Sequence, residues 1–280
     1  MADILTLVFR TFMSQTGLQK DLSAAPPPPT ARSALLVGEP NISRSVLLLA
    51  AVTAASEAGM RVIFFSQTQI QSLPASLPIF FFLLLKKIRF SYPRTVEELL
   101  QQVASLHEPT NTSPTPPSLI IVDRLESFLR APGEQSCAAH LCALLCDTAA
   151  FLTHILGQQS SSAAPCRVLA SFQSEVDPGQ RGGEASATQP VLDVLDRYFL
   201  VRYTLDRDTG YEATAAGLQE IWHIYLSGSG VTEVSGAKDC EDTPAVAQDR
   251  SLDVLLELDP SIKGGTQSLK SKFLLSQKVF

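Results

Sequence analysis

The residues of this chain that could do chemistry most directly lie in one octapeptide, Gly38-Glu39-Pro40-Asn41-Ile42-Ser43-Arg44-Ser45. It follows a short apolar run and precedes an apolar helix pattern, which is the setting of a phosphate-binding loop of the form G-x-x-x-x-G-K-[ST]. In such a loop, backbone N–H groups surround a nucleotide phosphate, the lysine bridges two phosphates, and the final hydroxyl ligates Mg²⁺. The octapeptide therefore predicts a nucleotide site with Ser45 as a metal ligand.

Two positions of the octapeptide depart from that form. Ser43 replaces the second glycine, and its Cβ lies where the loop favours a residue that adopts positive φ readily. Arg44 replaces the lysine, and a wide planar guanidinium is not equivalent to a compact ammonium at a phosphate. These departures predict a degenerate site that binds nucleotide and hydrolyses it poorly. On the octapeptide alone, a plain strand-to-helix turn capped by Asn41 or Ser43 remains an alternative.

A second metal ligand is predicted at the end of the clearest buried-strand pattern, Leu119 to Asp123. A carboxylate in that place can hold the water shell of Mg²⁺ opposite the loop hydroxyl, so ATP and Mg²⁺ are the expected cofactors. Gln173, after a later strand pattern, is the residue expected to contact the terminal phosphate. Residues 66 to 69, after the second strand pattern, carry no carboxylate to activate water, so no catalytic residue is assigned. Glu126 is the nearest alternative, although its position is typical of the first turn of a surface helix.

The densest basic stretch of the chain interleaves cations with aromatic rings. Its members are Lys86, Lys87, Arg89, Phe90, Tyr92 and Arg94. Positive charge with rings suits single-stranded DNA, because cations neutralise phosphates while bases stack on the rings. The formal net charge of the chain is -6, so DNA binding would have to depend on this local patch. The structural alternative is a charged sheet edge beside two packed rings.

The elements that must position these residues alternate between strand and helix. A strand at 35–37, a helix at 45–58 and a strand at 61–65 form a βαβ unit, which is the building block of a parallel sheet. Further patterns predict helices at 95–107, 134–156 and 191–199 and strands at 119–123 and 167–172. Alternating segments at 198–205 and 218–226 predict an antiparallel pair at the sheet edge. The fold class is therefore α/β, with a mainly parallel sheet flanked by helices.

The domain boundaries follow from changes in composition along the 280 residues. Residues 1–33 are predicted to be an N-terminal extension with a proline linker at 26–29, residues 34–227 the core domain, and residues 228–280 a disordered tail. The five cysteines form no C-x-x-C pair, which argues against a zinc site. The apolar run at 79–85 is far shorter than the ~20 residues that span a bilayer, so we expect no membrane contact.

Three segments together resemble a known family: Lys87 to Pro93, Leu145 to Phe151 with His154, and Arg197 to Phe199. They are similar to the RecA-like ATPase subunit that associates with a SWIM-type zinc-finger protein in the metazoan Shu complex, over roughly residues 34 to 226. The resemblance implies a RecA-like P-loop core related to recombinase paralogues. By position, Gly38, Ser43, Arg44, Ser45 and Asp123 match the two Walker motifs of that family.

The resemblance also implies a role and partners. The expected protein is a nuclear DNA-repair accessory factor that acts in homologous recombination after DNA damage. It would form a heterodimer with a SWIM-type zinc-finger protein, contact the recombinase and its paralogues, and bind single-stranded DNA, with a degenerate ATP site. Two alternatives remain open: an active ATPase stimulated by single-stranded DNA, and a nucleotide-free protein scaffold.

Overall fold

The protein is described by a computed structural model of residues 1–280. The structure describes residues 4–5, 7–8, 32–70, 85–108, 115–129, 134–159, 164–173, 189–207, 218–227, 250–258 and 275–276. The predicted apolar run at 79–85 and the proline linker lie almost entirely outside these residues. All statements below concern the described part of the chain.

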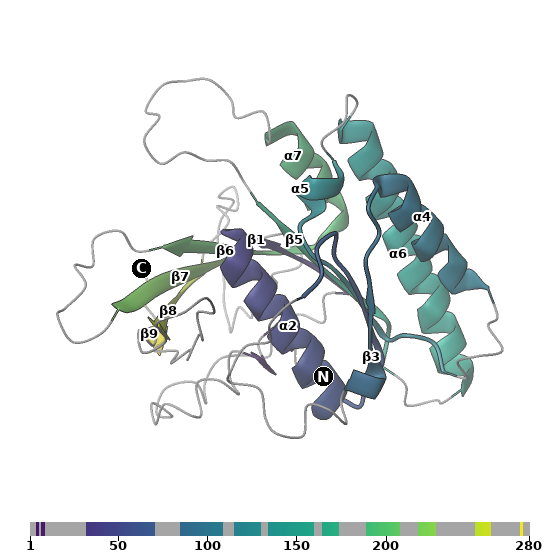
Figure 1. Ribbon diagram of the computed structural model, residues 1–280, viewed down its shortest axis with the longest axis horizontal. Helices are drawn as coiled ribbons and strands as arrows, with labels where there is room; N and C mark the ends of the chain where they lie inside the picture. The colour runs from purple at the N-terminus through teal and green to yellow at the C-terminus, as the bar shows by residue number, and fades with distance from the viewer. Residues whose placement is uncertain are drawn as a thin grey trace, which may run out of the picture.

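One nine-stranded sheet forms the centre of the molecule, in the order β3-β2-β4-β5-β1-β6-β7-β8-β9 (Figure 1). The strands are β1 Ser33–Val37, β2 Val62–Phe65, β3 Ile88–Ser91, β4 Leu119–Val122, β5 Arg167–Phe172, β6 Val201–Arg207, β7 Leu218–Ser227, β8 Arg250–Leu258 and β9 Leu275–Ser276. Strands β1 to β6 pair in parallel, and β6 pairs with β7 in antiparallel register. The predicted mainly parallel sheet with an antiparallel edge pair is confirmed.

Helices cover both faces of this sheet (Figure 1). They are α2 Pro40–Ser56, α4 Val96–Ala104, α5 Leu125–Phe128, α6 Glu134–Gln159 and α7 Gln189–Tyr198, with short 3-10 turns η2 Leu85–Lys87 and η3 Ser105–His107. Alternate residues of the central strands enter two separate apolar clusters, one around α2 and the other around α4, α5, α6 and α7. Burial on both faces explains why β1, β2, β4 and β5 are almost continuously apolar.

Helix α6 is long and apolar enough, judged by length and composition alone, to cross a membrane. Its side chains Leu141, Leu145 and Leu152 are buried in the cluster that packs on the sheet. Core helices of soluble proteins pass the same test, so this packing assigns α6 to the core of the domain.

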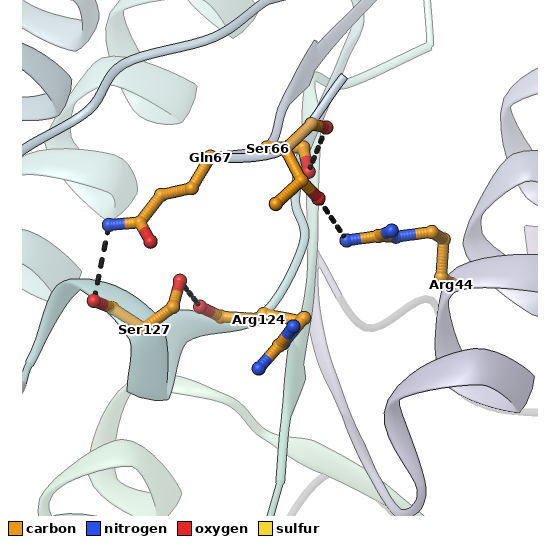
Figure 2. A pocket seen from close by; sticks show the side chains of 6 residues that line it. Arg44, Ser66, Gln67, Arg124 and Ser127 are labelled. Carbon is orange, nitrogen blue, oxygen red and sulfur yellow. Dashed lines mark hydrogen bonds between the residues drawn. The ribbon is translucent and has the colours of Figure 1, made fainter. Parts of the chain in front are cut away.

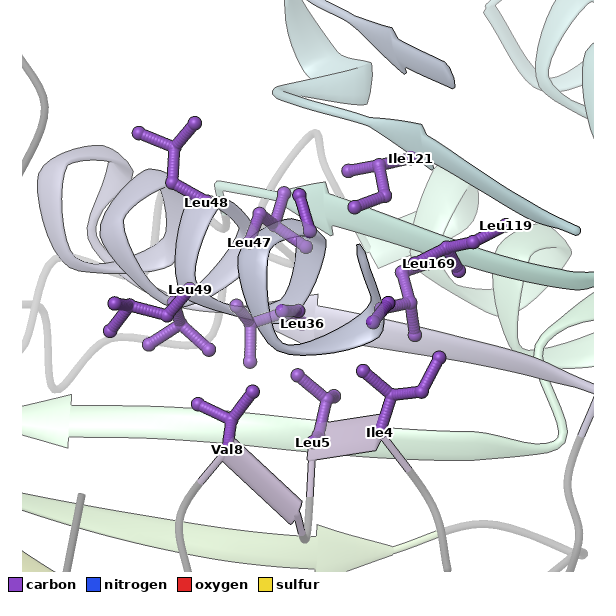
Figure 3. Packing of buried hydrophobic residues seen from close by; sticks show 14 of the residues in the cluster. Ile4, Leu5, Val8, Leu36, Leu47, Leu48, Leu49, Leu119, Ile121 and Leu169 are labelled. Atoms are coloured by element: carbon purple, nitrogen blue, oxygen red, sulfur yellow. The ribbon is translucent and has the colours of Figure 1, made fainter. Parts of the chain in front are cut away.

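The structure differs from the predicted domain ends in two places. Ile4, Leu5 and Val8, assigned from the sequence to an extension, are buried against α2 and β1 (Figure 3). Strands β8 and β9 lie within the segment 228–280 that was predicted to be disordered. Antiparallel pairing with β7 organises β8, a long-range interaction that composition does not reveal. The domain boundaries themselves stay predictions.

Candidate functional site

Polar side chains meet at the carboxyl ends of the parallel strands, on the edge where open α/β sheets bind ligands. Asp123 directly follows β4, Ser66 directly follows β2, and Ser171 lies near the end of β5. Arg44 reaches them from α2, the helix that follows β1. The fold thus brings together Arg44 and Asp123, the predicted lysine equivalent and metal ligand, which are 79 positions apart in the chain.

The carboxylate of Asp123 is fully buried, with a relative exposure of 0%. Its Oδ2 accepts a hydrogen bond from Arg44 Nε at 2.7 Å, and Ser66 Oγ lies 3.1 Å from the same oxygen. Ser171 Oγ donates to Oδ1 at 3.2 Å. A buried carboxylate requires donors and a counter-charge, and here the protein itself supplies both.

Arg44 uses two edges of its guanidinium. While Nε contacts Asp123, Nη2 donates to Thr68 Oγ1 at 2.7 Å. Ser66 Oγ also lies 3.1 Å from the backbone carbonyl of Thr68, which ties the segment after β2 into the same network. Figure 2 shows Arg44 reaching across from α2 toward these residues, opposite Gln67 and above Arg124. The partly open cavity there has a volume of about 150 Å³ and is lined by Arg44, Ser66, Gln67, Thr68, Arg124 and Ser127.

The octapeptide is mostly helical. Helix α2 begins at Pro40, with Glu39 as its N-cap, whereas the sequence predicted a loop as far as Ser45. That part of the prediction is wrong, because proline at the first helical position is already set for helix geometry. The N–H of Ser43 donates to the carbonyl of Glu39 at 3.0 Å, which is a helical hydrogen bond. The alternative caps, Asn41 and Ser43, are also wrong, since both lie inside the helix.

Ser45, the predicted metal ligand from this segment, faces its own helix. Its Oγ donates to the backbone carbonyl of Asn41 at 2.9 Å. Ile42 is buried in the apolar cluster around α2, so it contributes packing at this end of the helix. The assignment of residues 38–45 to a nucleotide stays a prediction.

Packing against a neighbouring strand explains why residue 38 is a glycine. A Cβ built on this residue would lie 2.7 Å from Leu205 Cβ and 3.0 Å from the Leu205 carbonyl oxygen. The N–H of Gly38 donates to the carbonyl of Phe172 at 3.2 Å. The glycine is therefore needed where the chain leaves β1 close to β6, whether or not a phosphate binds.

Ser43 occupies the position of the second loop glycine and is 1% exposed. Its Oγ has no hydrogen-bond partner among the described residues. An unsatisfied buried hydroxyl costs about 1–3 kcal/mol. The serine is thus tolerated here rather than required, and its removal would leave no partner unpaired.

Glu126 links Arg124, a lining residue of the cavity, to Gln173. Glu126 Oε1 accepts from Arg124 Nε at 3.0 Å, and Oε2 accepts from the backbone N–H of Gln173 at 3.0 Å. Arg124 has a left-handed backbone with φ of 61°, and its N–H donates to Ser171 Oγ at 2.8 Å. Both oxygens of Glu126 are engaged, so in this arrangement it ties the start of α5 to the residue that follows β5. The proposed contact of Gln173 with a phosphate stays a prediction.

Four members of the network were missed from the sequence: Ser66, Thr68, Arg124 and Ser171. One signal was available, because Ser171 is a polar residue between the apolar residues Ala170 and Phe172 of β5. A buried polar residue in such a strand indicates a specific hydrogen-bond partner. Ser66 and Thr68 lie within three residues of the end of β2. Their part in the site could be recognised only when the positions of the neighbouring strand ends were known.

Protein groups engage both of the metal ligands that the sequence predicted. Mg²⁺ takes oxygen ligands at about 2.0–2.1 Å, and several of these are usually water molecules that the protein holds in turn. Asp123 Oδ2 already contacts a guanidinium nitrogen at 2.7 Å, and Ser45 Oγ is bonded within α2. A cation cannot approach that carboxylate oxygen unless Arg44 leaves it.

The predicted DNA-binding residues lie at the outer edge of the sheet. Lys86, Lys87, Arg89 and Arg94 are exposed, while Phe90 and Tyr92 are half-buried. Their edge strand β3 pairs with β2, and the ring of Phe90 lies 5.6 Å from that of Phe64. Lys87 Nζ donates to the carbonyl of Ala55 near the end of α2 at 3.2 Å. The stretch is thus a charged sheet edge with partly accessible rings.

Two curated relatives match this chain, whereas no protein-family model does. ATPase SWSAP1 of Mus musculus is 38% identical over 192 residues, which cover 68% of this chain and 62% of that protein. ATPase SWSAP1 of Homo sapiens is 35% identical over 177 residues, which cover 62% of this chain and 71% of that protein. The chain belongs to the ATPase SWSAP1 family. It spans less than two thirds of the mouse member's length.

Two solved structures also show a distant likeness to the chain. A KaiC-like protein of Pyrococcus horikoshii matches with a TM-score of 0.44 and 10% identity, covering 80% of this chain and 86% of that one. The ATPase domain of G40P matches with a TM-score of 0.47 and 10% identity, covering 89% and 94%. The core of the SWSAP1-family chain is a mainly parallel α/β sheet flanked by helices, as its sequence predicted.

Proposed function

We propose that the protein is a nuclear DNA-repair accessory factor of homologous recombination that binds single-stranded DNA and carries a degenerate ATP site. The observation that carries the binding role is the row of exposed cations at the β3 edge, beside two half-buried rings. Membership of the SWSAP1 family supports the recombination setting. The internal ion pair of Asp123 supports the degenerate site.

The basic edge suits a nucleic-acid backbone because its charges are accessible. Lys86, Lys87 and Arg89 are exposed within four positions of each other, so neighbouring phosphates can be contacted together. Phe90 and Tyr92 are half-buried, which holds the rings in place and leaves part of each ring open to a base. Stacking on such a ring contributes roughly 1–3 kcal/mol per base.

Binding is tested by fluorescence anisotropy with the full chain and a labelled single-stranded oligonucleotide at several salt concentrations. Replacing Lys86, Lys87 and Arg89 by alanine should weaken binding and lower the salt slope by about 2, because each lost phosphate contact on a single strand removes roughly 0.7. Arg89→Ala alone is compared with Arg197→Ala, a matched control that removes an exposed arginine on α7, away from the β3 edge. Unchanged affinity in the triple variant would contradict the proposed surface.

The ion pair of Asp123 also favours a second candidate, a scaffold that binds no nucleotide. Titration calorimetry with Mg-ATP separates the two. The degenerate-site proposal expects heat of binding without turnover above background, whereas a scaffold gives a flat trace with folded protein. Steady turnover stimulated by single strands would support instead the active ATPase considered from the sequence.

The proposed partners are a SWIM-type zinc-finger protein, the recombinase and recombinase paralogues. They are the partners that the resemblance of the sequence to its family implies, and the matched regions are 35–38% identical to SWSAP1 relatives. Co-expression with the zinc-finger protein followed by size-exclusion chromatography tests the heterodimer. Separate elution of the two folded chains would contradict it.

A further inference from the structure

Arg44 is the residue whose contacts differ most from what its sequence position suggests. At this position a phosphate-binding loop presents a lysine to the nucleotide. Here the guanidinium faces protein, with Nε 2.7 Å from Asp123 Oδ2 and Nη2 2.7 Å from Thr68 Oγ1. We propose that Arg44 is an internal counter-ion of Asp123, which takes the place of a metal ion and makes the binding of Mg-nucleotide weak. This inference rests on the proposed degenerate ATP site.

The shape of arginine explains why it can do this. A guanidinium presents several donors in a rigid planar fork, whereas an ammonium is a compact point charge. Arg44 uses that fork to contact the residue after β4 and the segment after β2 at the same time. A lysine could neutralise Asp123, but one ammonium on a flexible stem does not hold both strand ends in fixed geometry. Arginine at this position therefore holds the two strand ends in a fixed arrangement, whereas lysine would allow them to rearrange around a ligand.

The same contacts keep the octapeptide helical. Arg44 lies one residue after Ser43, whose N–H completes a helical hydrogen bond to Glu39 at 3.0 Å. A phosphate loop over residues 40–43 would have to break this bond and move Arg44 away from Asp123. Moving Arg44 would leave the Asp123 carboxylate, which is 0% exposed, without a counter-charge. An uncompensated buried charge is strongly unfavourable. The ion pair and the early start of α2 thus stabilise each other.

The low affinity for Mg-nucleotide then depends on two residues, Ser43 and Arg44. The hydroxyl of Ser43 has no partner, so glycine can replace it without breaking a hydrogen bond. Lysine in place of Arg44 retains the positive charge near Asp123. The inference therefore predicts that the paired exchange Ser43→Gly and Arg44→Lys opens a latent site, in which Asp123 and Ser45 are still present.

The test is calorimetry and thermal unfolding of the full chain with Mg-ADP, which reports binding without turnover. The double variant S43G/R44K should bind, and at about 100 times its Kd the ligand should raise Tm by roughly 5 to 10 °C. Wild type and S43G alone, which both keep Arg44, should bind at least 100-fold more weakly. Adding Asp123→Asn to the double variant should remove the dependence on Mg²⁺, measured against ADP with EDTA.

Two outcomes would overturn the inference. One is a folded double variant that does not bind Mg-ADP, and the other is wild type binding as tightly as the double variant. If the double variant does not fold, the single variant Arg44→Lys tests the inference instead. It should bind Mg-ADP more tightly than wild type, and equal affinity would overturn the inference. The DNA-binding test is independent of these results, so the proposed recombination role can fail while this inference holds, or the reverse.

Discussion

Replacing Arg44 by alanine should destabilise the protein strongly, because Asp123 would lose its counter-charge. The carboxylate is 0% exposed, and only the hydroxyl groups of Ser66 and Ser171 would remain as side-chain donors. Removing one partner of a buried ion pair costs about 3–5 kcal/mol. The side chain of Arg44 is 27% exposed and borders a cavity of about 150 Å³, so water can reach part of the vacated space. We therefore expect the lower end of that range, about 3 kcal/mol.

Neutralising Asp123 instead should lower the free energy of unfolding by less. In Asp123→Asn the charge left behind is that of Arg44, which is 27% exposed and can be hydrated, so we expect about 1–2 kcal/mol. The double variant R44A/D123N has no unpaired charge and should be more stable than R44A alone. This non-additivity is characteristic of a direct interaction, since distant sites add within about 0.5 kcal/mol.

Urea denaturation followed by circular dichroism measures all four proteins of this cycle. At constant m-value, a loss of about 3 kcal/mol in R44A corresponds to a Tm lower by roughly 6–12 °C for a domain of this size. Arg197→Ala, at an exposed site on α7, is the control and should stay within about 0.5 kcal/mol. An R44A variant as stable as this control, or a strictly additive cycle, would refute the assignment of Arg44 as the counter-ion of Asp123.

Three further predictions concern packing and titration. Gly38→Ala should lower the free energy of unfolding by about 1–3 kcal/mol, because its Cβ would lie 2.7 Å from a β6 side chain. Gly157→Ala, on open helix surface, should raise it by roughly 0.5–1 kcal/mol in the same urea assay, and equal effects would contradict the packing role. Burial raises the pKa of Cys142 and of Cys166 from 9.0 to about 12. Their contribution to the free energy of unfolding is therefore fully present below pH 9 and is lost as the pH rises toward 12. The urea midpoint should fall over that pH range. Both thiols should resist alkylation until the protein unfolds, and rapid native labelling would show that they are accessible. Val8→Asp should lower Tm by several degrees, as Val8 is 0% exposed, whereas an unchanged melting curve would show that the N-terminal residues contribute nothing to the core.

The order of strands and helices could be predicted because it is a local property. Continuous apolar runs such as Leu119–Val122 mark strands that are buried on both faces, and the stripe in α4 marks a helix with one buried face. Thr95 accepts a hydrogen bond from the N–H of Glu98 at 3.2 Å, so even the start of α4 is encoded by adjacent residues. The antiparallel pairing of β6 with β7 was predicted in the same way, from alternating apolar and polar residues in two segments separated by a turn.

The start of α2 could have been predicted but was not. Pro40 is a standard first residue of a helix, yet the likeness of the octapeptide to a phosphate loop placed the start at Ser45. Gly38 was likewise interpreted as a loop glycine, although the contact that requires it comes from β6, far along the chain. A motif specifies residue types at a spacing, whereas their conformation depends on what packs beside them.

Local residue patterns were enough to predict the fold class, the strand that carries Asp123 and the resemblance to a family of ATPases. The role of Arg44 depends on how distant elements pack together. A guanidinium 79 positions before a carboxylate becomes its counter-ion only if β4 and β5 bring that carboxylate to α2 and bury it from water. In the same way, burial of Ile4, Leu5 and Val8 depends on an apolar surface built from distant elements. Local patterns encode elements, but charge pairing and burial are properties of neighbours in space.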